Sequence, residues 1–217
     1  MKIARLFVAA LLVPTLASAQ TTIGSAGGFT ISPFGRPGSQ SYGQTFTTPA
    51  VDTRLDLFSF WARGSEAVTF KAHVFAWDAA NTRATGPALF SSAVMTTPAG
   101  LPNFSRIDVS TGGLLLDAGQ RYVAFVSVND VMGDDGTTTF EGATADNYSG
   151  GAFVYQNQNG SSSWTNDGWS TNFVSNGRDM RFEMQFDQAV VPEPSTYALM
   201  ATGLMGLGAL ARRRRNA

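Results

Sequence analysis

The chain has a single histidine, His73, so any serine–histidine–acid or histidine–zinc chemistry would have to use it. A catalytic serine needs an adjacent base and commonly sits in a Gly-x-Ser-x-Gly turn, which this sequence lacks. His73 lies between Lys71 and Phe75 in an alternating segment, which is typical of a histidine on a strand face. Cysteine is absent, which excludes thiol catalysis, disulfides and zinc–thiolate sites. We therefore expect a protein without enzyme activity.

Acidic side chains gather in the segment 128–137, where Asp130, Asp134 and Asp135 are close together in sequence. Glycoside hydrolysis needs two carboxyl groups that face each other across a cleft, and one acidic loop does not supply that arrangement. Ca²⁺ takes several oxygen ligands from aspartate, asparagine and backbone carbonyls, so these three residues could form a calcium loop, although the spacing of an EF-hand is absent. The default interpretation is a solvated acidic turn, and no other cofactor is indicated.

Two tryptophans, Trp164 and Trp169, lie among asparagine and aspartate residues in the segment 146–177. Sugar rings stack on aromatic faces while amides and carboxylates bond hydroxyl groups, so Trp164, Trp169 and Asp167 could contact a sugar. The alternative is that both tryptophans close one end of the fold. We expect the segment to form a hairpin and long loops.

These residues are positioned by segments in which apolar and polar side chains alternate with a period of two. The strong segments are 55–61, 68–77, 122–128 and 181–187, and weaker ones are 43–48, 88–94, 105–109 and 151–155. Glycine, proline, asparagine and aspartate separate them, which indicates an all-β sandwich or barrel. We expect a single antiparallel β-sandwich over residues 20–190, with the closing strand near the first. The expected core residues are Phe58, Phe60, Phe70, Val74, Val126, Phe182 and Phe186.

The charge of the body argues against nucleic acid as a partner. Between Gln20 and Val191 there are 9 lysines and arginines against 15 aspartates and glutamates, a balance of 9 − 15 = −6. Nucleic-acid phosphates need lysine and arginine to replace their counterions, and the body has no basic cluster.

The N-terminus has the pattern of a signal peptide over residues 1–19. Lys2 and Arg5 precede an apolar run, which is followed by small residues at Ala17 and Ala19. Cleavage after Ala19 would leave Gln20 as the first residue of the mature chain. The alternative is an uncleaved membrane anchor.

The C-terminal tail, residues 191–217, has three consecutive parts. Val191-Pro192-Glu193-Pro194-Ser195 comes first, and an uncharged apolar run over 196–211 follows. The basic end 212–217 contains four consecutive arginines, Arg212, Arg213, Arg214 and Arg215.

The apolar run is expected to be a transmembrane helix over 196–211. As a helix, the 15 residues from Tyr197 would be about 22 Å long, short of the roughly 30 Å hydrocarbon core. Local thinning and snorkelling arginines could cover the deficit. We expect the four arginines to hold the end of this helix in the cytoplasm.

This tail resembles the PEP-CTERM sorting domain. The resemblance covers about the last 27 residues and implies processing near Pro192-Glu193-Pro194 by an exosortase, a transpeptidase-like membrane enzyme. It also implies a Gram-negative host that makes extracellular polysaccharide. The body resembles, loosely, the jelly-roll domains often attached to such tails.

Together these features predict an exported protein of the cell envelope or extracellular matrix. Its precursor would be anchored in the inner membrane, and the processed protein would lie at the cell surface or outside the cell. The body is expected to be a structural or polysaccharide-contacting module. A glycoside hydrolase-like enzyme on a β-sandwich is the alternative.

Overall fold

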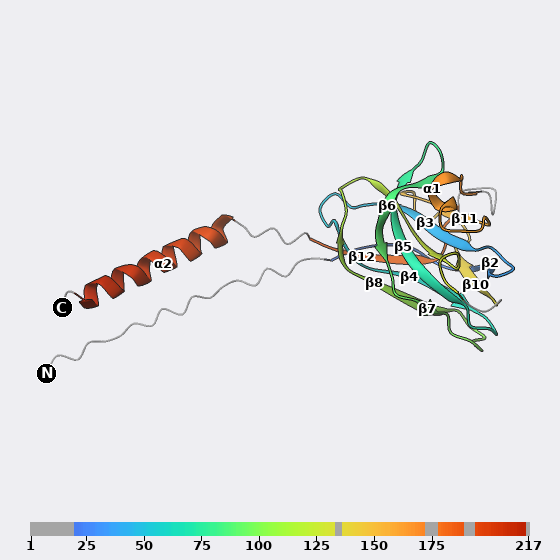
Figure 1. Ribbon diagram of the computed structural model, residues 1–217, viewed down its shortest axis with the longest axis horizontal. Coiled ribbons are helices and arrows are strands. Elements are labelled where there is room, and N and C mark those ends of the chain that lie inside the picture. Colours follow the sequence, from blue (N-terminus) through green and yellow to red (C-terminus); the bar gives the residue numbers. More distant parts are fainter. Residues whose placement is uncertain (1–19, 133–135, 172–177, 189–193, 216–217) are drawn as a thin grey trace.

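The computed structural model describes residues 20–132, 136–171, 178–188 and 194–215 (Figure 1). Two antiparallel sheets face each other across a shared apolar core, which confirms the expected all-β sandwich. The signal region 1–19, with Ala17 and Ala19, lies outside the described residues. Gln20 is the first described residue and is exposed.

The first sheet has six strands in the order β1-β12-β4-β10-β2, with β8 paired to β4. β12 pairs with both β1 and β4, so the last strand lies beside the first, as expected. The strands of this sheet are β1 (Thr21–Ser25), β2 (Phe29–Gly35), β4 (Arg54–Arg63), β8 (Ser105–Leu115), β10 (Thr137–Gly142) and β12 (Phe182–Asp187).

The second sheet has the order β11-β3-β9-β5-β6, with the short strand β7 paired to β5. Its central strand β9 pairs with β3 on one side and β5 on the other. The strands of this sheet are β3 (Ser41–Thr47), β5 (Thr69–Asp78), β6 (Arg83–Ser91), β7 (Met95–Thr96), β9 (Arg121–Ser127) and β11 (Phe153–Gln156).

The main core lies between the two sheets and is rich in phenylalanine. Phe140 of β10 packs edge-on against Phe34, Tyr42 and Phe60, with ring centroids 5.2, 5.8 and 6.3 Å away. Aromatic rings prefer such tilted contacts because their electron-rich faces meet electron-poor edges. All seven core residues expected from the sequence are buried, at 1 % exposure or less.

Strand β4 shows how a bulge changes which residues face the core. Leu55 and Phe58 are both fully buried although they are three residues apart, a spacing that a regular strand would place on opposite faces. The pairing of β4 with β12 shifts between Gln185 and Phe186, which leaves Asp56 as the extra residue of β4. A bulge of this kind resets the alternation, so both apolar side chains point inward.

The tail forms one helix, α2 (Pro194–Arg215), which lies clear of the sandwich in Figure 1. The helix begins before residue 196, because Pro194 and Ser195 of the sorting motif already belong to it. Proline suits a first helical turn, where its missing N–H has no role. Val191, Pro192 and Glu193 lie outside the described residues.

The helix also extends past residue 211, because α2 continues through the whole basic cluster. Its last four residues are Arg212, Arg213, Arg214 and Arg215, and the first three of them are exposed. Arginines near the C-terminal end of a helix are favoured by the helix dipole. The basic cluster is therefore the last turn of the helix and not a separate segment after it.

No described helix is long and apolar enough to cross a bilayer. The transmembrane helix expected over 196–211 is therefore not confirmed. The cytoplasmic placement of Arg212, Arg213, Arg214 and Arg215, which depends on such a helix, stays a prediction from the sequence.

Candidate functional site

The outer face of the second sheet carries a second apolar cluster, which the segment 157–170 covers. The short helix α1 (Ser163–Asn166) lies in this covering segment, and the indole N–H of Trp169 donates to the carbonyl oxygen of Trp164 at 3.0 Å. Sheet residues contribute the floor of the cluster. Its buried members are Phe75, Ala84, Val123, Phe125, Val154, Trp164 and Trp169.

The sugar site expected at Trp164, Trp169 and Asp167 is corrected by this arrangement. Trp164 is 5 % exposed and Trp169 is 3 % exposed, so neither ring presents a face to solvent. Asp167 is exposed and caps the C-terminal end of α1. The tryptophans anchor the covering segment to the sheet, in line with the alternative interpretation that they close the fold.

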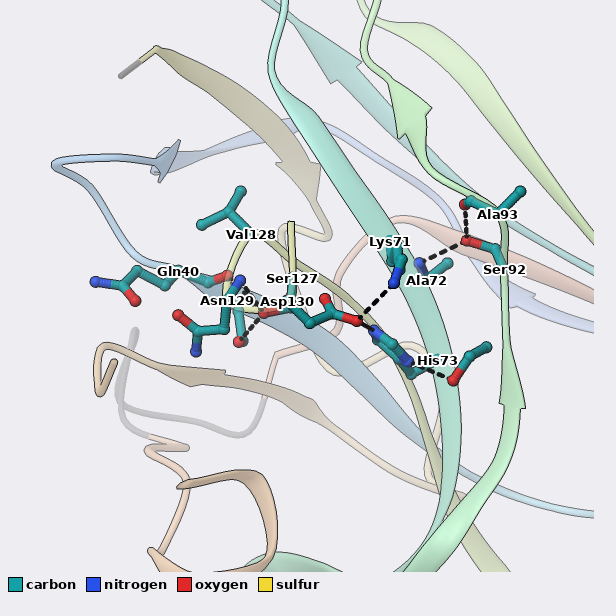
Figure 2. Close-up of polar contacts among 12 residues, drawn as sticks. Gln40, Lys71, Ala72, His73, Ser92, Ala93, Ser127, Val128, Asn129 and Asp130 are labelled. Carbon is teal, nitrogen blue, oxygen red and sulfur yellow. Dashed lines mark hydrogen bonds and ion pairs between the residues drawn. The ribbon is translucent and has the colours of Figure 1, made fainter. Parts of the chain in front are cut away.

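A polar cluster lies beside this second core and joins β5, β6 and the loop after β9 (Figure 2). Lys71 and His73 of β5 both point at Asp130, with Lys71 Nζ and His73 Nε2 each 3.4 Å from its Oδ2. The other ring nitrogen, Nδ1, lies 2.9 Å from the hydroxyl of Ser91 on β6. The imidazole packs 4.6 Å from the Trp164 ring, so the polar cluster and the aromatic cluster touch.

The environment of His73 favours its neutral form. Burial lowers its pKa, and Asp130 opposes this effect only in part. Ser91, His73 and Asp130 lie in a row, and these residue types are used together in nucleophilic catalysis. However, the imidazole is 2 % exposed, and Lys71 shares the carboxylate that would orient it. This arrangement suits a structural link between strands, as expected for a histidine on a strand face.

The calcium loop expected at Asp130, Asp134 and Asp135 is only partly described. Asp134 and Asp135 lie outside the described residues, and the carboxylate of Asp130 points to Lys71 and His73. No group of three acidic or histidine side chains gathers into a metal site within the described ranges. Calcium binding therefore stays a prediction from the sequence.

An open groove lies on the second sheet beside the covered cluster, with a volume of about 170 Å³. Trp77 and Arg121 line it, and Thr82 contributes from the turn between β5 and β6. We call it the Trp77–Arg121 groove. Its lining residues are Thr45, Trp77, Ala79, Thr82, Arg121, Gly151, Ala152, Val154 and Thr171.

Small residues create the hollow of this groove. Gly151 lies so close to β3 that an added Cβ would be 1.7 Å from the carbonyl oxygen of Thr45, so only glycine fits. The hydroxyl of Thr45 donates to Ala152 O at 3.2 Å, and Ala152 N–H donates back to it at 2.8 Å. These contacts fix the start of β11 against β3 and hold the groove floor in place.

Asp179 forms a second buried polar centre, between the sheets. Its carboxylate accepts from Gln44 Nε2 at 2.8 Å and from the backbone N–H groups of Asn147 and Tyr148 at 3.1 and 2.9 Å. The side-chain oxygen of Gln44 in turn accepts from Met180 N–H at 2.9 Å. A single side chain of the second sheet therefore binds the two residues, Asp179 and Met180, that precede β12. Burial raises the pKa of Asp179 to about 6, although the three donors oppose the shift.

This raised pKa gives a pH-dependent contribution to stability. The native state holds the Asp179 proton up to pH about 6, whereas an unfolded aspartate releases it near pH 4. The stabilising contribution is therefore present at low pH and is lost as pH rises through this window. An Asp179→Asn variant should be less stable by about 1–3 kcal/mol, since its amide N–H₂ faces donors.

Urea unfolding at pH 4 and pH 7 measures the stability gap between wild type and Asp179→Asn. We expect the gap to shrink as pH rises, because the variant does not titrate there. Asp117→Asn, at an exposed position, serves as the control. A gap that grows with pH would contradict the assignment.

Sequence reasoning missed the residues that line the groove. Trp77 is the last residue of the predicted strand 68–77. It is seven residues after the core residue Phe70, so strand alternation places the two side chains on opposite faces. This alternation was the one sequence feature that could have indicated a tryptophan outside the core. Arg121 and Thr82 had no signal of their own. They meet Trp77 only because β9 pairs with β5 and the turn before β6 folds over the same face.

The comparisons with known proteins assign the tail. The family model described as the PEP-CTERM protein-sorting motif matches residues 190–215. This match confirms the resemblance drawn from the segment 191–195 and from the arginines Arg212, Arg213, Arg214 and Arg215, so the chain carries a PEP-CTERM sorting motif. The match does not extend to the body.

The comparisons do not assign the body. No curated protein matches the chain. The chain is similar to a solved structure of the cysteine protease and lectin-like domains of Cwp84, a surface layer associated protein of Clostridium difficile, with 13 % identity and a TM-score of 0.48. The similarity covers 81 % of this chain and 37 % of that chain, and at this level it carries no argument about function.

Proposed function

We propose that this chain is an exported bacterial surface or matrix protein. Its tail is processed by an exosortase-type enzyme near Pro192-Glu193-Pro194, and its body is a non-enzymatic module that contacts extracellular polysaccharide. The observation that carries the proposal is the PEP-CTERM sorting motif at residues 190–215. Such a motif implies export and sorting to the cell surface.

Helix α2 supports a role for the tail at the membrane surface before processing. Met200, Leu204, Met205 and Leu207 are each more than 60 % exposed and precede the basic last turn 212–215. Apolar side chains favour burial away from water, and arginines are attracted to the anionic surface of a membrane. The precursor is held there, at the inner membrane of a Gram-negative cell, while the enzyme acts.

Co-sedimentation with the host's extracellular polysaccharide tests the role of the body. The exported protein, purified from the host medium, should pellet with the polymer and leave its chain length unchanged. Release of shorter sugar fragments would point to the alternative, a carbohydrate-active enzyme. A protein that stays in the supernatant would contradict the polysaccharide-contacting role.

A further inference from the structure

We propose that the Trp77–Arg121 groove binds a carboxylate-bearing sugar, of the uronic-acid class, within an acidic extracellular polysaccharide. This inference rests on the proposed function and names the site and the chemistry of its ligand. Three observations carry it, namely the size of the groove, the isolated charge of Arg121 and the strained turn at Thr82.

The groove is the size of a site for one sugar ring. Its volume of about 170 Å³ is below the roughly 300–1,000 Å³ of pockets for drug-sized molecules, and it is open to solvent. An open groove on a sheet face can take one unit of a long polymer while the chain continues on both sides. Trp77 is half-buried at its wall, and an aromatic ring there offers a platform for a pyranose.

Among the described residues that line the groove, Arg121 is the only charged one. Its side chain is exposed and has no ion pair within the part of the chain that the structure describes, in a body whose balance is 9 − 15 = −6. Most other arginines of the sandwich are paired with acids or stacked on rings, such as Arg106 with Glu183 and Arg63 over Phe104. A guanidinium group binds a carboxylate through two parallel hydrogen bonds, which distinguishes an acidic sugar from a neutral one.

Thr82 holds the rim of the groove in a strained backbone conformation. Its φ of 49° lies in the left-handed region, and no other non-glycine residue of the described ranges has a positive φ. For a β-branched residue this conformation is costly, and such strain tends to be retained at binding sites. The Thr82 carbonyl oxygen accepts from the backbone N–H of Trp169 at 2.7 Å, so the covering segment fixes the turn and keeps the rim preformed.

Calorimetric titration of the exported protein tests the site, with oligogalacturonate as the acidic probe and a cello-oligosaccharide of equal length as the neutral one. We expect binding of the acidic probe that weakens with added salt. Arg121→Gln should weaken it about 10- to 100-fold, the range for losing a charged hydrogen-bond pair. Trp77→Ala should weaken it as well, and Trp77→Phe should restore part of the affinity because it keeps a ring.

Arg63→Gln, on the other sheet, is the matched control and should bind like wild type, with thermal unfolding confirming that each variant folds. Equal affinity for both probes, or an Arg121→Gln variant that binds oligogalacturonate as well as wild type, would overturn the inference. If the protein pellets with host polysaccharide and Arg121→Gln has no effect, the groove is wrong and the proposed function stands. If Arg121-dependent binding is seen without co-sedimentation, the groove stands and the proposed polysaccharide role fails.

Discussion

Truncation of Phe140 to alanine is expected to lower the free energy of unfolding by about 3–5 kcal/mol, the usual cost of removing a buried phenylalanine. Phe140 is fully buried, and its ring contacts those of Phe34, Tyr42 and Phe60. Phe34 and Phe60 come from the same sheet and Tyr42 from the facing one, so the cavity would open where the two sheets meet. At about 2–4 °C per kcal/mol for a domain of this size, the melting temperature should fall by roughly 10 °C.

Thermal and urea unfolding measure this effect. Leu115→Ala is the control, because Leu115 is 63 % exposed and its removal should change stability by less than about 0.5 kcal/mol. If the Phe140→Ala and Leu115→Ala variants unfold at the same temperature, Phe140 does not lie between the sheets.

Replacement of Pro192, Glu193 and Pro194 by alanine is expected to abolish processing of the tail. Pro194 is the first residue of α2, and proline is disfavoured inside a helix, so Pro192 and Pro194 oppose extension of the helix toward the body. We expect the processing enzyme to need this limit on the helix. With alanines, α2 could extend toward the body from its present start at Pro194. The uncleaved precursor should then accumulate in the membrane fraction, where immunoblotting can follow it.

Two further variants make this prediction specific. Pro98→Ala with Pro102→Ala changes two exposed loop prolines of the body and should leave processing intact. Neutral residues in place of the four arginines 212–215 should reduce retention at the membrane before processing, since each arginine near an anionic surface contributes about 1 kcal/mol. Normal processing of the triple alanine variant would show that the enzyme does not read this motif.

The sequence predicted the strands whose alternation is clear. Segments 55–61, 68–77 and 122–128 correspond to β4, β5 and β9, because large apolar side chains recur at every second position. β1, β2 and β10 were missed. Thr21–Ser25 and Thr137–Gly142 contain mainly threonine, glycine and serine and one large apolar residue each, and Pro33 interrupts the pattern of β2. Pairing of β1 with β12 and of β10 with β2, rather than local pattern, makes them strands.

The candidate site depended still more on tertiary structure. Polar neighbours around Trp164 and Trp169 correctly indicated a loop, but the sequence does not show that this loop folds onto the outer face of the second sheet. The groove combines side chains from β5, β9 and the approach to β11, which are far apart in sequence. Only the tail could be assigned from the sequence alone, because its three parts are contiguous.

Intact-mass analysis of the mature protein, recovered from the surface and secreted fractions of an exosortase-bearing host, decides whether the tail is a sorting signal. We expect a chain that begins at Gln20 and has lost the four arginines 212–215, with its new C-terminus near Pro192-Glu193-Pro194. The same host without its exosortase gene should yield only the longer form. A wild-type mature protein that still carries the whole tail, arginines included, would contradict sorting by this route.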